Sequence, residues 1–401
     1  MAKPKIRFKG YTDDWEQRKF GDLVEKYEDP IDTPTDGYMR LGIRSHAKGT
    51  FHSYVEKGKE LETAKMFRVA ANNFIVNITF GWEHAVAITD ESDAGKLVSH
   101  RFPQYSFENG MIPMFFKYLI LDENFKHHLE LSSPGGAGRN RVLKLNDMLE
   151  YKMKFPCEDE QRKLASYFDD LDHLITLHQR KCEETKKLKK YMLQKMFPQN
   201  GQTVPEIRFS GFTDAWEQRK LGEIATETYG GGTPKTSNEE FWKGDIPWIQ
   251  SSDLIDECLF DVRPRKCISQ EAVSKSATKL VPQNSIAIVT RVGVGKLAFM
   301  PFSYATSQDF LSLSGLKIDP EFTVYALYKM MQSVSNEVQG TSIKGVTKDE
   351  LLAKKIIFPS CNEQKKIGAY LHNLDHLITL HQYKCEQLQS MKKFMLQNMF
   401  V

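Results

Sequence analysis

Hydrophobic residues in two parts of the chain recur in alternating steps of four and three residues. The first series runs from Leu164 to Met196, and the second from Ile367 to Met399. This spacing, kept over about four to five heptads, is typical of a coiled coil rather than of a helix on a globular surface. It predicts two helices of roughly 35 residues, each about 50 Å long.

Each series forms a hydrophobic seam along its helix. A second hydrophobic row lies beside each seam, and Lys and Glu fill the outer positions. Its members are Leu174, Leu177, Leu188 and Tyr191 in the first helix and Leu377, Leu380 and Met391 in the second. Each helix is too narrow to fold alone, so we expect the two to pack against each other. Because a whole domain connects them, an antiparallel pair related by a pseudo-twofold axis is the simplest arrangement. The alternative is two independent amphipathic helices on separate domains.

The segments before the helices contain short β-branched and aromatic runs separated by turn residues. Strands are predicted at residues 72–80 (NNFIVNITF) and 284–291 (NSIAIVTR), at both WEQRK motifs, and at YKMKFP and KKIIFP. Helices are predicted at residues 112–131 and 320–338. The fold class that this predicts is mixed α/β (α+β), in two copies joined by the two long helices.

The chain is an internal repeat. Residues 4–23 read PKIRFKGYTDDWEQRKFGDL and residues 205–224 read PEIRFSGFTDAWEQRKLGEI, an offset of 201 residues (205 − 4). The helical segments that begin with EQRKL at Glu160 and EQKKI at Glu363 repeat with an offset of 203 residues (363 − 160). The segments between them share little, so two different modules are expected in one repeated frame. The predicted domains are residues 1–157 and 199–359, which are the modules, and residues 158–198 and 360–401, which are the helices.

Composition narrows the possible classes of protein. The 401 residues are 40% hydrophobic and 27% charged, with a formal net charge of +3. This weakly basic balance permits binding to nucleic acid through local patches without requiring it. The six cysteines show neither a C-x-x-C pair nor zinc-ligand spacing, which argues against a disulfide framework or a zinc ribbon. We see no signal peptide and no apolar run of about 18 residues, so a cytoplasmic protein is expected.

The loops of both modules carry residue types that contact DNA. Arg, Lys, Gln, Asn, Ser and Thr on Gly-rich turns can reach phosphates and base edges. A solvated polar turn is the simpler interpretation of any single loop, but such loops recur at matching places: residues 99–102 (SHRF) correspond to residues 307–310 (SQDF). The predicted DNA contacts are Arg40, Arg44, His46, Lys48, His100, Arg101, Arg139, Asn140 and Arg141 in the first module, and Thr233, Lys235, Thr236, Ser252, Arg291, Lys296, Gln308, Asp309 and Lys344 in the second.

The sequence lacks the common motifs of catalysis. The sequence VGVGK at residues 292–296 resembles a phosphate-binding loop, but Leu297 stands where that motif has Ser or Thr, and its first Gly is missing. We find no G-x-S-x-G, no H-E-x-x-H and no acidic nuclease cluster. His178 and His381 occupy seam positions, where polar residues usually set the helix register. No metal or catalytic residue is predicted in this chain.

The motifs of the second half resemble those of a known family. The order WEQRK-L-G, GGTP, FWKGDIPWI, TRVGVGK, SQDF, GTSIKG, a strand ending in FP and EQKKI opening a long helix is similar to that of the specificity subunit of type I restriction–modification enzymes. The resemblance covers essentially the whole chain. The first module departs from the series, since Arg44-Ser45-His46 and Phe80-Gly81-Trp82 replace parts of it.

The resemblance implies a DNA sequence-recognition subunit that is not an enzyme by itself. Each module would be a target-recognition domain that reads one half of a bipartite site in double-stranded DNA. The helices would act as spacer and as docking surface for two methyltransferase subunits, with restriction/translocase subunits added for cleavage. S-adenosylmethionine, ATP and Mg would belong to these partners, and no cofactor to this chain. The alternatives are a coiled-coil adaptor without DNA contact, or a self-contained DNA methyltransferase or nuclease, which lacks the motifs it needs.

Two further expectations follow from the repeat. Because the second hydrophobic row recurs in both helices, we expect two copies of one partner to dock there, on Leu174, Leu177, Leu188, Leu377 and Leu380. Antiparallel helices would hold the modules at the two ends of a rod, so the half-sites should be centred about one DNA turn, about 34 Å, apart. The DNA site should be asymmetric because the modules differ.

Overall fold

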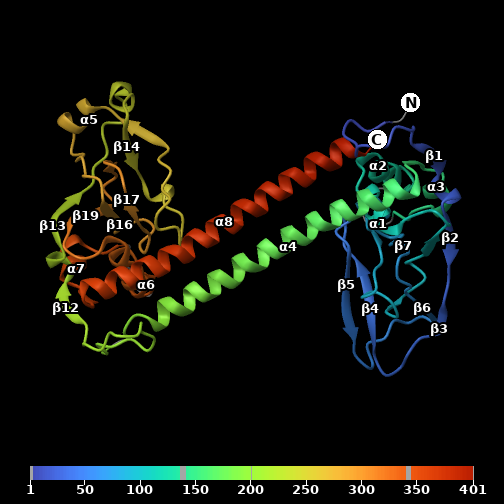
Figure 1. Cartoon of the computed structure of the whole chain (residues 1–401), viewed down its shortest axis with the longest axis horizontal. Coiled ribbons are helices and arrows are strands. Elements are labelled where there is room, and N and C mark those ends of the chain that lie inside the picture. Colours follow the sequence, from blue (N-terminus) through green and yellow to red (C-terminus); the bar gives the residue numbers. More distant parts are fainter. Residues whose placement is uncertain (1–2, 136–140, 200, 340–344, 401) are drawn as a thin grey trace. The chain divides into compact units, whose positions relative to one another are not determined.

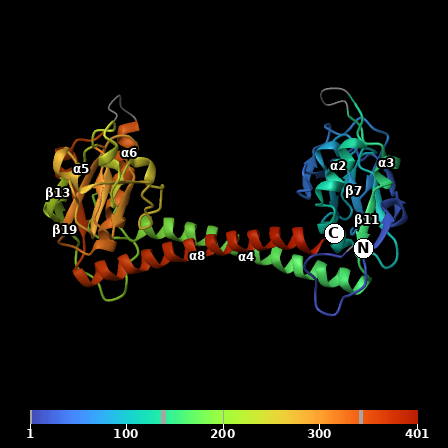
Figure 2. The ribbon, with the colours of Figure 1, turned by 90° about the horizontal axis from the view of Figure 1, so that it is seen from above.

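The structure, a computed structural model, describes residues 3–135, 141–199, 201–339 and 345–400. The chain divides into two compact units, residues 1–177 with 384–401 (unit 1) and residues 178–383 (unit 2). The long helices α4 (Glu158–Lys195) and α8 (Cys361–Met399) each contribute one half to each unit. Figure 1 labels the elements, and Figure 2 shows the same ribbon from above. Within the described residues, no helix combines the length and apolar character needed to cross a membrane.

Unit 1 contains three antiparallel or mixed sheets beside three short helices. Strands β1 and β11 form a two-stranded sheet, β2-β10-β7-β8 a four-stranded sheet, and β3-β6-β9-β4-β5 a five-stranded sheet. The elements are β1 (Glu16–Lys19), β2 (Val24–Tyr27), β3 (Pro30–Asp32), β4 (Tyr38–Ile43), β5 (Thr50–Val55), β6 (Lys65–Arg68), β7 (Phe74–Val76), β8 (Val86–Ile88), β9 (Leu97–Val98), β10 (Gln104–Phe107), α1 (Pro113–Leu119), α2 (Glu123–Leu131), α3 (Leu145–Leu149) and β11 (Lys152–Phe155), with the 3-10 turns η1 (Phe20–Asp22) and η2 (Gly81–Glu83).

Unit 2 repeats the first two sheets and shortens the third. Strands β12 and β20 pair, β13-β19-β16-β17 form a four-stranded sheet, and β15-β14-β18 a three-stranded sheet. The elements are β12 (Glu217–Lys220), β13 (Ala225–Gly230), β14 (Ile246–Ile249), β15 (Lys266–Ile268), α5 (Gln270–Lys275), β16 (Ser285–Val289), β17 (Leu297–Met300), β18 (Ala305–Thr306), β19 (Phe310–Leu316), α6 (Pro320–Gln339), α7 (Lys348–Ala353) and β20 (Lys355–Phe358), with the 3-10 turns η3 (Leu221–Glu223), η4 (Glu239–Trp242) and η5 (Ser251–Asp253).

The strands expected from the sequence are present, which confirms the mixed α/β fold. Both WEQRK motifs form a strand that pairs with the strand before the long helix, β1 with β11 and β12 with β20. The predicted runs 72–80 and 284–291 contain β7 and β16, each at the centre of a four-stranded sheet. These strands are fully buried, because the sheet carries core on both of its faces.

The helical stretch expected over residues 112–131 is present, but it is divided into two helices. Helix α1 ends at Leu119, and Asp122 caps the start of α2 by accepting a hydrogen bond from the backbone N–H of Asn124. The carbonyl of Ile120 is engaged by the buried ring of His84, with Nε2 2.8 Å from the oxygen. Burial lowers the pKa of His84, so the neutral ring donates this bond. The second predicted helix is confirmed as α6.

The two long helices pack antiparallel, as predicted, and contacts inside each unit establish the direction. In unit 2, His178 contacts His381 and Lys189 pairs with Asp375. Residue numbers therefore increase along α4 in the direction in which they decrease along α8. In unit 1, Asp172 pairs with Lys392 in the same sense. The alternative of two independent amphipathic helices is therefore wrong.

The contacts of the helix pair occur twice, once in each unit. Asp172 pairs with Lys392 and Asp375 with Lys189, both with a nitrogen–oxygen distance of 2.5 Å. Each carboxylate also accepts a hydrogen bond from a module tyrosine, Tyr118 at 3.0 Å or Tyr325 at 2.5 Å. Burial raises the pKa of both phenols, so the hydroxyls remain donors. The paired aspartates and the paired lysines each differ by 203 positions, so the repeat in the sequence is also a repeat in the contacts.

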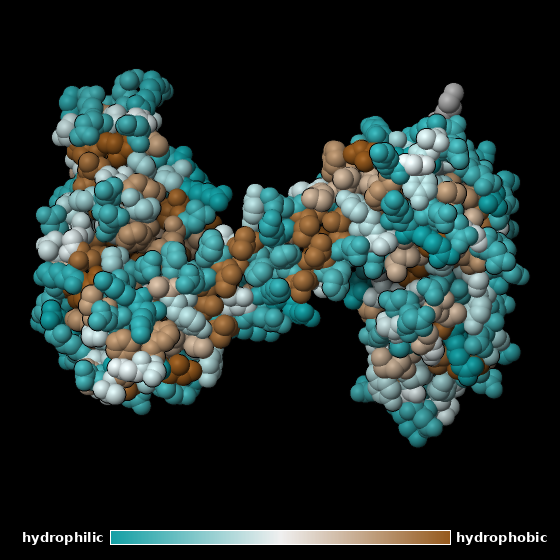
Figure 3. Space-filling view, in the orientation of Figure 1, coloured by the Kyte–Doolittle hydropathy of each residue, from teal (hydrophilic) through white to brown (hydrophobic). Residues whose placement is uncertain are grey.

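The seam is buried for two different reasons along its length. Near the start of each helix it lies in the module core, as Leu164 and Phe168 do in unit 1 and Ile367 and Leu371 in unit 2. Farther along, it faces the other helix, where the thiol of Cys385 donates to the carbonyl of Ile175 at 3.4 Å. Most of the second row is exposed: Leu174, Leu188, Leu377 and Leu380 have 40–41% of their surface accessible, whereas the predicted Leu177 is half-buried. Figure 3 shows hydrophobic side chains among hydrophilic ones on this surface.

The histidine pair predicts a dependence of stability on pH. The Nδ1 atoms of His178 and His381 lie 3.0 Å apart, so one ring donates and the other accepts, and both cannot be protonated favourably. Burial, then the charges of His178 and Lys181, lower the pKa of His381. The folded state therefore binds fewer protons than the unfolded state, and stability should fall as pH drops below the unfolded value of about 6.5. Urea unfolding at pH 7.5 and 5.5 measures this loss.

The control for the histidine pair is the double variant His178→Asn/His381→Asn, which keeps a polar seam without a titrating group. Other carboxylates and histidines contribute equally to wild type and variant, so their effect cancels in the comparison. The variant should lose less stability between the two pH values than wild type does. Equal losses would show that this pair does not titrate with folding.

Candidate nucleic-acid interface

The two modules present their polar loops from one shared main-chain arrangement. In unit 1 the backbone N–H of Ile78 donates to the carbonyl of Arg101 at 3.0 Å, and Leu143 donates to Ile78 at 2.8 Å. In unit 2 Thr290 donates to Asp309 at 2.7 Å, and Val346 to Thr290 at 2.8 Å. The loop before β10 thus corresponds to the loop before β19, so Arg101 and Asp309 occupy equivalent places. This confirms the predicted correspondence of SHRF and SQDF.

In unit 1 most of the predicted residues that the structure describes lie on β4 and in two loops. Arg40 is on β4, and Arg44, His46 and Lys48 are in the turn to β5. His46 and Ala47 have positive φ angles of 62° and 48°, and their backbone N–H groups donate to the carbonyls of Glu83 and His84. Non-glycine residues hold this left-handed backbone only where the surroundings fix it. Here two hydrogen bonds to the η2 segment fix the turn.

The second loop of unit 1 carries His100 and Arg101, both exposed. Together with Arg40 they border one hollow of the module, whereas Arg44 lies over the ring of Phe51, 5.3 Å from its centroid. Arg141 is farther along, 5.6 Å from the ring centroid of Trp82 and 4.0 Å from Glu130. The predicted Arg139 and Asn140 lie outside the described residues.

In unit 2 the structure brings two predicted contacts together. Thr233 and Gln308 are both exposed, and the hydroxyl of Thr233 donates to the side-chain oxygen of Gln308 at 2.9 Å. The amide nitrogen of Gln308 remains available as a donor, which suits an acceptor on a base edge. Lys235 and Thr236 are exposed nearby in sequence, and the carboxylate of Asp309 accepts from the hydroxyl of Ser307 at 3.2 Å.

The glycines of the GGTP motif explain how these two loops meet. The backbone N–H of Gly232 donates to Thr306 at 2.8 Å, and its carbonyl accepts from the indole of Trp248 at 3.1 Å. A Cβ atom at Gly231 would lie 1.8 Å from the backbone oxygen of Ser307. Only glycine allows this approach, which holds Thr233 beside Gln308.

The other predicted residues of unit 2 are spread over separate loops. Ser252 is exposed in η5, and Arg291 is exposed after β16. Lys296 is half-buried and engaged within the protein: its ammonium donates to the carbonyl of Leu254 at 3.0 Å and lies 3.7 Å from Asp256. These two contacts hold its ammonium against the protein, so Lys296 is less free to reach DNA than the exposed Arg291. Lys344 lies outside the described residues.

Sequence reasoning missed the aromatic residues and the amide that line the hollow beside Arg40. Phe51, Phe80, Phe102 and Asn77 contribute to it from β5, the end of β7 and the loop before β10. Phe51 is 38% exposed, which is unusual for so large an apolar side chain. In the described part of the chain, no group of three or more His, Cys, Asp or Glu could hold a metal ion.

The chain is similar to proteins of one kind. The family described as type I restriction modification DNA specificity domain matches residues 213–390. The type I restriction enzyme MjaIX specificity subunit of Methanocaldococcus jannaschii is 30% identical over 195 residues, which are 46% of this chain and 44% of that protein. The chain thus spans under half of this relative. The putative MjaX specificity subunit of the same organism is 22% identical over 399 residues, 95% of this chain and 91% of the relative.

The fold is also similar to a solved structure. The crystal structure of the S subunit of a type I restriction–modification system from M. genitalium superposes with a TM-score of 0.62 at 14% identity, covering 100% of this chain and 99% of that one. At this identity the likeness concerns the fold. Residues 213–390 therefore match a type I restriction modification DNA specificity domain, and the chain as a whole is similar to type I specificity subunits in sequence and in fold.

Proposed function

We propose that this chain reads DNA sequence for a type I restriction–modification complex, each module recognising one half of an asymmetric bipartite site. The observation that carries the proposal is the shared main-chain arrangement that presents Arg101 in one module and Asp309 in the other. A constant frame with different polar side chains suits a protein that reads two different sequences in the same manner. The chain itself has a recognition role, without catalysis.

Selection from random duplexes tests this function. The full chain, with its methyltransferase partner where needed, is incubated with a random-sequence pool, and the bound duplexes are sequenced. We expect two different blocks of fixed bases separated by an unread run of constant length, because each module would read its own block and the same two helices would join the modules in every complex. A bound pool without any shared sequence would contradict the proposal.

Single loop variants should each change one half-site. Arg101→Ala should cost roughly 1–3 kcal/mol of binding and relax the bases read by the first module, and Gln308→Ala should do the same for the second. Sequencing of the pools bound by each variant measures the change. Lys243→Ala, an exposed lysine paired with Glu240, serves as the control and should leave both blocks unchanged. An unaltered site and affinity for both loop variants would refute the assignment of these loops.

We propose that two copies of a methyltransferase subunit dock on the exposed rows of the helix pair. Support comes from their recurrence at equivalent positions, Leu174 with Leu377 and Leu177 with Leu380, since a repeated surface binds repeated partners. Methyl transfer from S-adenosylmethionine, with ATP- and Mg-dependent cleavage by restriction/translocase subunits, would then be the task of the partners.

The docking rows predict a change in stoichiometry. Leu377→Glu with Leu380→Glu should remove one of two bound partner copies, because charge in an apolar contact is costly to bury. Native mass spectrometry of the assembled complex counts the copies. Leu131→Glu, at a more exposed leucine of α2, is the matched control and should keep both. One partner copy per wild-type chain at saturation would contradict the model.

A further inference from the structure

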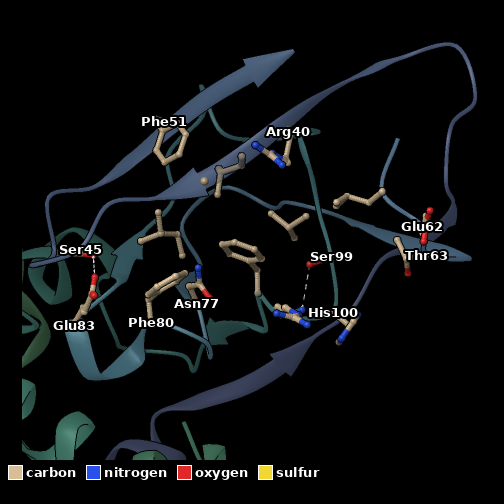
Figure 4. A pocket seen from close by; sticks show the side chains of 17 residues that line it. Arg40, Ser45, Phe51, Glu62, Thr63, Asn77, Phe80, Glu83, Ser99 and His100 are labelled. Carbon is tan, nitrogen blue, oxygen red and sulfur yellow. Dashed lines mark hydrogen bonds between the residues drawn. The ribbon is translucent and has the colours of Figure 1, made fainter. Parts of the chain in front are cut away.

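The hollow in unit 1 is built like a ligand site. Its volume is about 660 Å³, within the range of roughly 300–1,000 Å³ of small-molecule sites. Three phenylalanines line it, Phe51 from β5, Phe80 before η2 and Phe102 before β10. In Figure 4, Phe51 and Arg40 lie on one side of the hollow, and Asn77 and Phe80 on the other. The lining thus combines these aromatic rings with polar side chains, which include the carboxylates of Glu62 and Glu83.

Asn77 places an unpaired donor in this hollow. The residue is 9% exposed, and its side-chain oxygen accepts from the backbone N–H of Thr79 at 3.0 Å. Among the described residues nothing accepts from its side-chain nitrogen, which in Figure 4 points towards the strands that carry Phe51 and Arg40. This nitrogen is not fully buried, so it is accessible from the hollow and can donate to an acceptor that enters there.

The second module has no such donor at the equivalent place. Backbone hydrogen bonds show that Asn77 corresponds to Val289. The N–H of Asn77 donates to Ala85, and the N–H of Val289 donates to Lys296. In both modules the next residue, Ile78 or Thr290, donates to the loop before β10 or β19. Val289 is fully buried in an apolar cluster with Ile249 and Leu254. The shared main-chain arrangement therefore does not require an asparagine at this position. Asn77 is one of the residues that distinguish the first module from the second.

We propose that this hollow receives one nucleobase swung out of the DNA duplex. The base would stack among Phe51, Phe80 and Phe102, and a carbonyl oxygen of its ring would accept from the amide of Asn77. Aromatic side chains hold unstacked bases in this way, and extruded bases are read through their polar edge. Arg40, His100 and Arg101 at the rim are placed for the flanking phosphates.

A base that stays in the duplex presents only its groove edge and cannot bring a ring between these phenylalanines. Thymine, cytosine and guanine carry the required carbonyl, which makes the hollow a specificity-determining site of the first half-site. The inference rests on the proposed DNA-reading function. It adds that the chain itself, without its partners, distorts the duplex at one position.

The test uses the full chain alone and duplexes of its selected site. At each position of the first half-site, the base opposite is changed so that the pair becomes a mismatch while the base to be read is kept. Extruding a base from a mismatch costs less free energy than extruding it from a matched pair. The duplex with the mismatch at the extruded position should therefore bind at least tenfold more tightly than the matched duplex. A 2-aminopurine placed beside that position should brighten on binding, because it loses its stacking neighbour.

Asn77→Val, which installs the residue of the second module, should remove base preference at that position and leave the second half-site unchanged. If this variant does not fold, the mismatch and fluorescence measurements on wild type still decide. Weaker binding for every mismatch, without brightening, would overturn the hollow as a base site. Failure to select any site would instead overturn the proposed function, so the two failures are distinguishable.

Discussion

Glu160→Gln should lower the free energy of unfolding of unit 1 by about 3–5 kcal/mol, because it leaves a buried guanidinium without its counter-charge. Arg7 makes two hydrogen bonds of 2.7 Å to the two carboxylate oxygens of Glu160, whose side chain is 1% exposed. The bond to Glu160 raises the pKa of Arg7, so the arginine stays charged. The pair fastens the N-terminal repeat segment to the start of α4.

Unit 2 offers the same experiment through its duplicate. Arg208 donates to both oxygens of Glu363 at 2.7 and 2.8 Å, so Glu363→Gln should destabilise unit 2 by a similar amount. Glu158→Gln is the control on the same helix: it breaks an exposed pair with Arg162 four residues along, which contributes only about 0.3–0.5 kcal/mol. Denaturant unfolding with probes in each unit gives the three values. A loss below about 1 kcal/mol for both buried pairs would contradict the assigned role.

Gly231→Ala should destabilise unit 2 by about 3 kcal/mol or more and remove recognition of the second half-site. The added methyl carbon would overlap the backbone oxygen of Ser307, and no flexible side chain is there to move aside. Relief requires the GGTP turn to separate from the loop that carries Gln308. The hydrogen bond between Thr233 and Gln308 would then be lost.

The neighbouring glycine supplies the control for this substitution. A Cβ atom at Gly230 meets nothing within 4 Å, so Gly230→Ala changes the same residue type one position away without overlap. Unfolding measurements and selection from random duplexes should show nearly wild-type behaviour for this control. The steric argument fails if the two alanine variants behave alike.

The frame of this protein could be inferred from its residue pattern alone. Heptad spacing predicts long helices because the period of an α-helix is local, and the repeat of EQRKL and EQKKI predicts that both pack alike. The antiparallel pairing followed from the length of the connection. The strands at the WEQRK motifs could also be predicted, because the alternation of apolar and polar residues and the turn residues around it are local signals. The division into modules and helices at residues 157–158, 198–199 and 359–360 remains a prediction.

Contacts between residues that are far apart in the sequence decided where the helices break and which side chains meet. The break near residue 120 depends on His84, whose ring engages the carbonyl of Ile120 from 36 residues away, and no local period contains that information. The pair of Arg7 and Glu160 spans 153 residues. Polar loops could be identified as candidates because composition is local. That Thr233 meets Gln308, that Lys296 is engaged internally, and that Asn77 faces a hollow lined by phenylalanines follow only from how the sheets bring separate segments together.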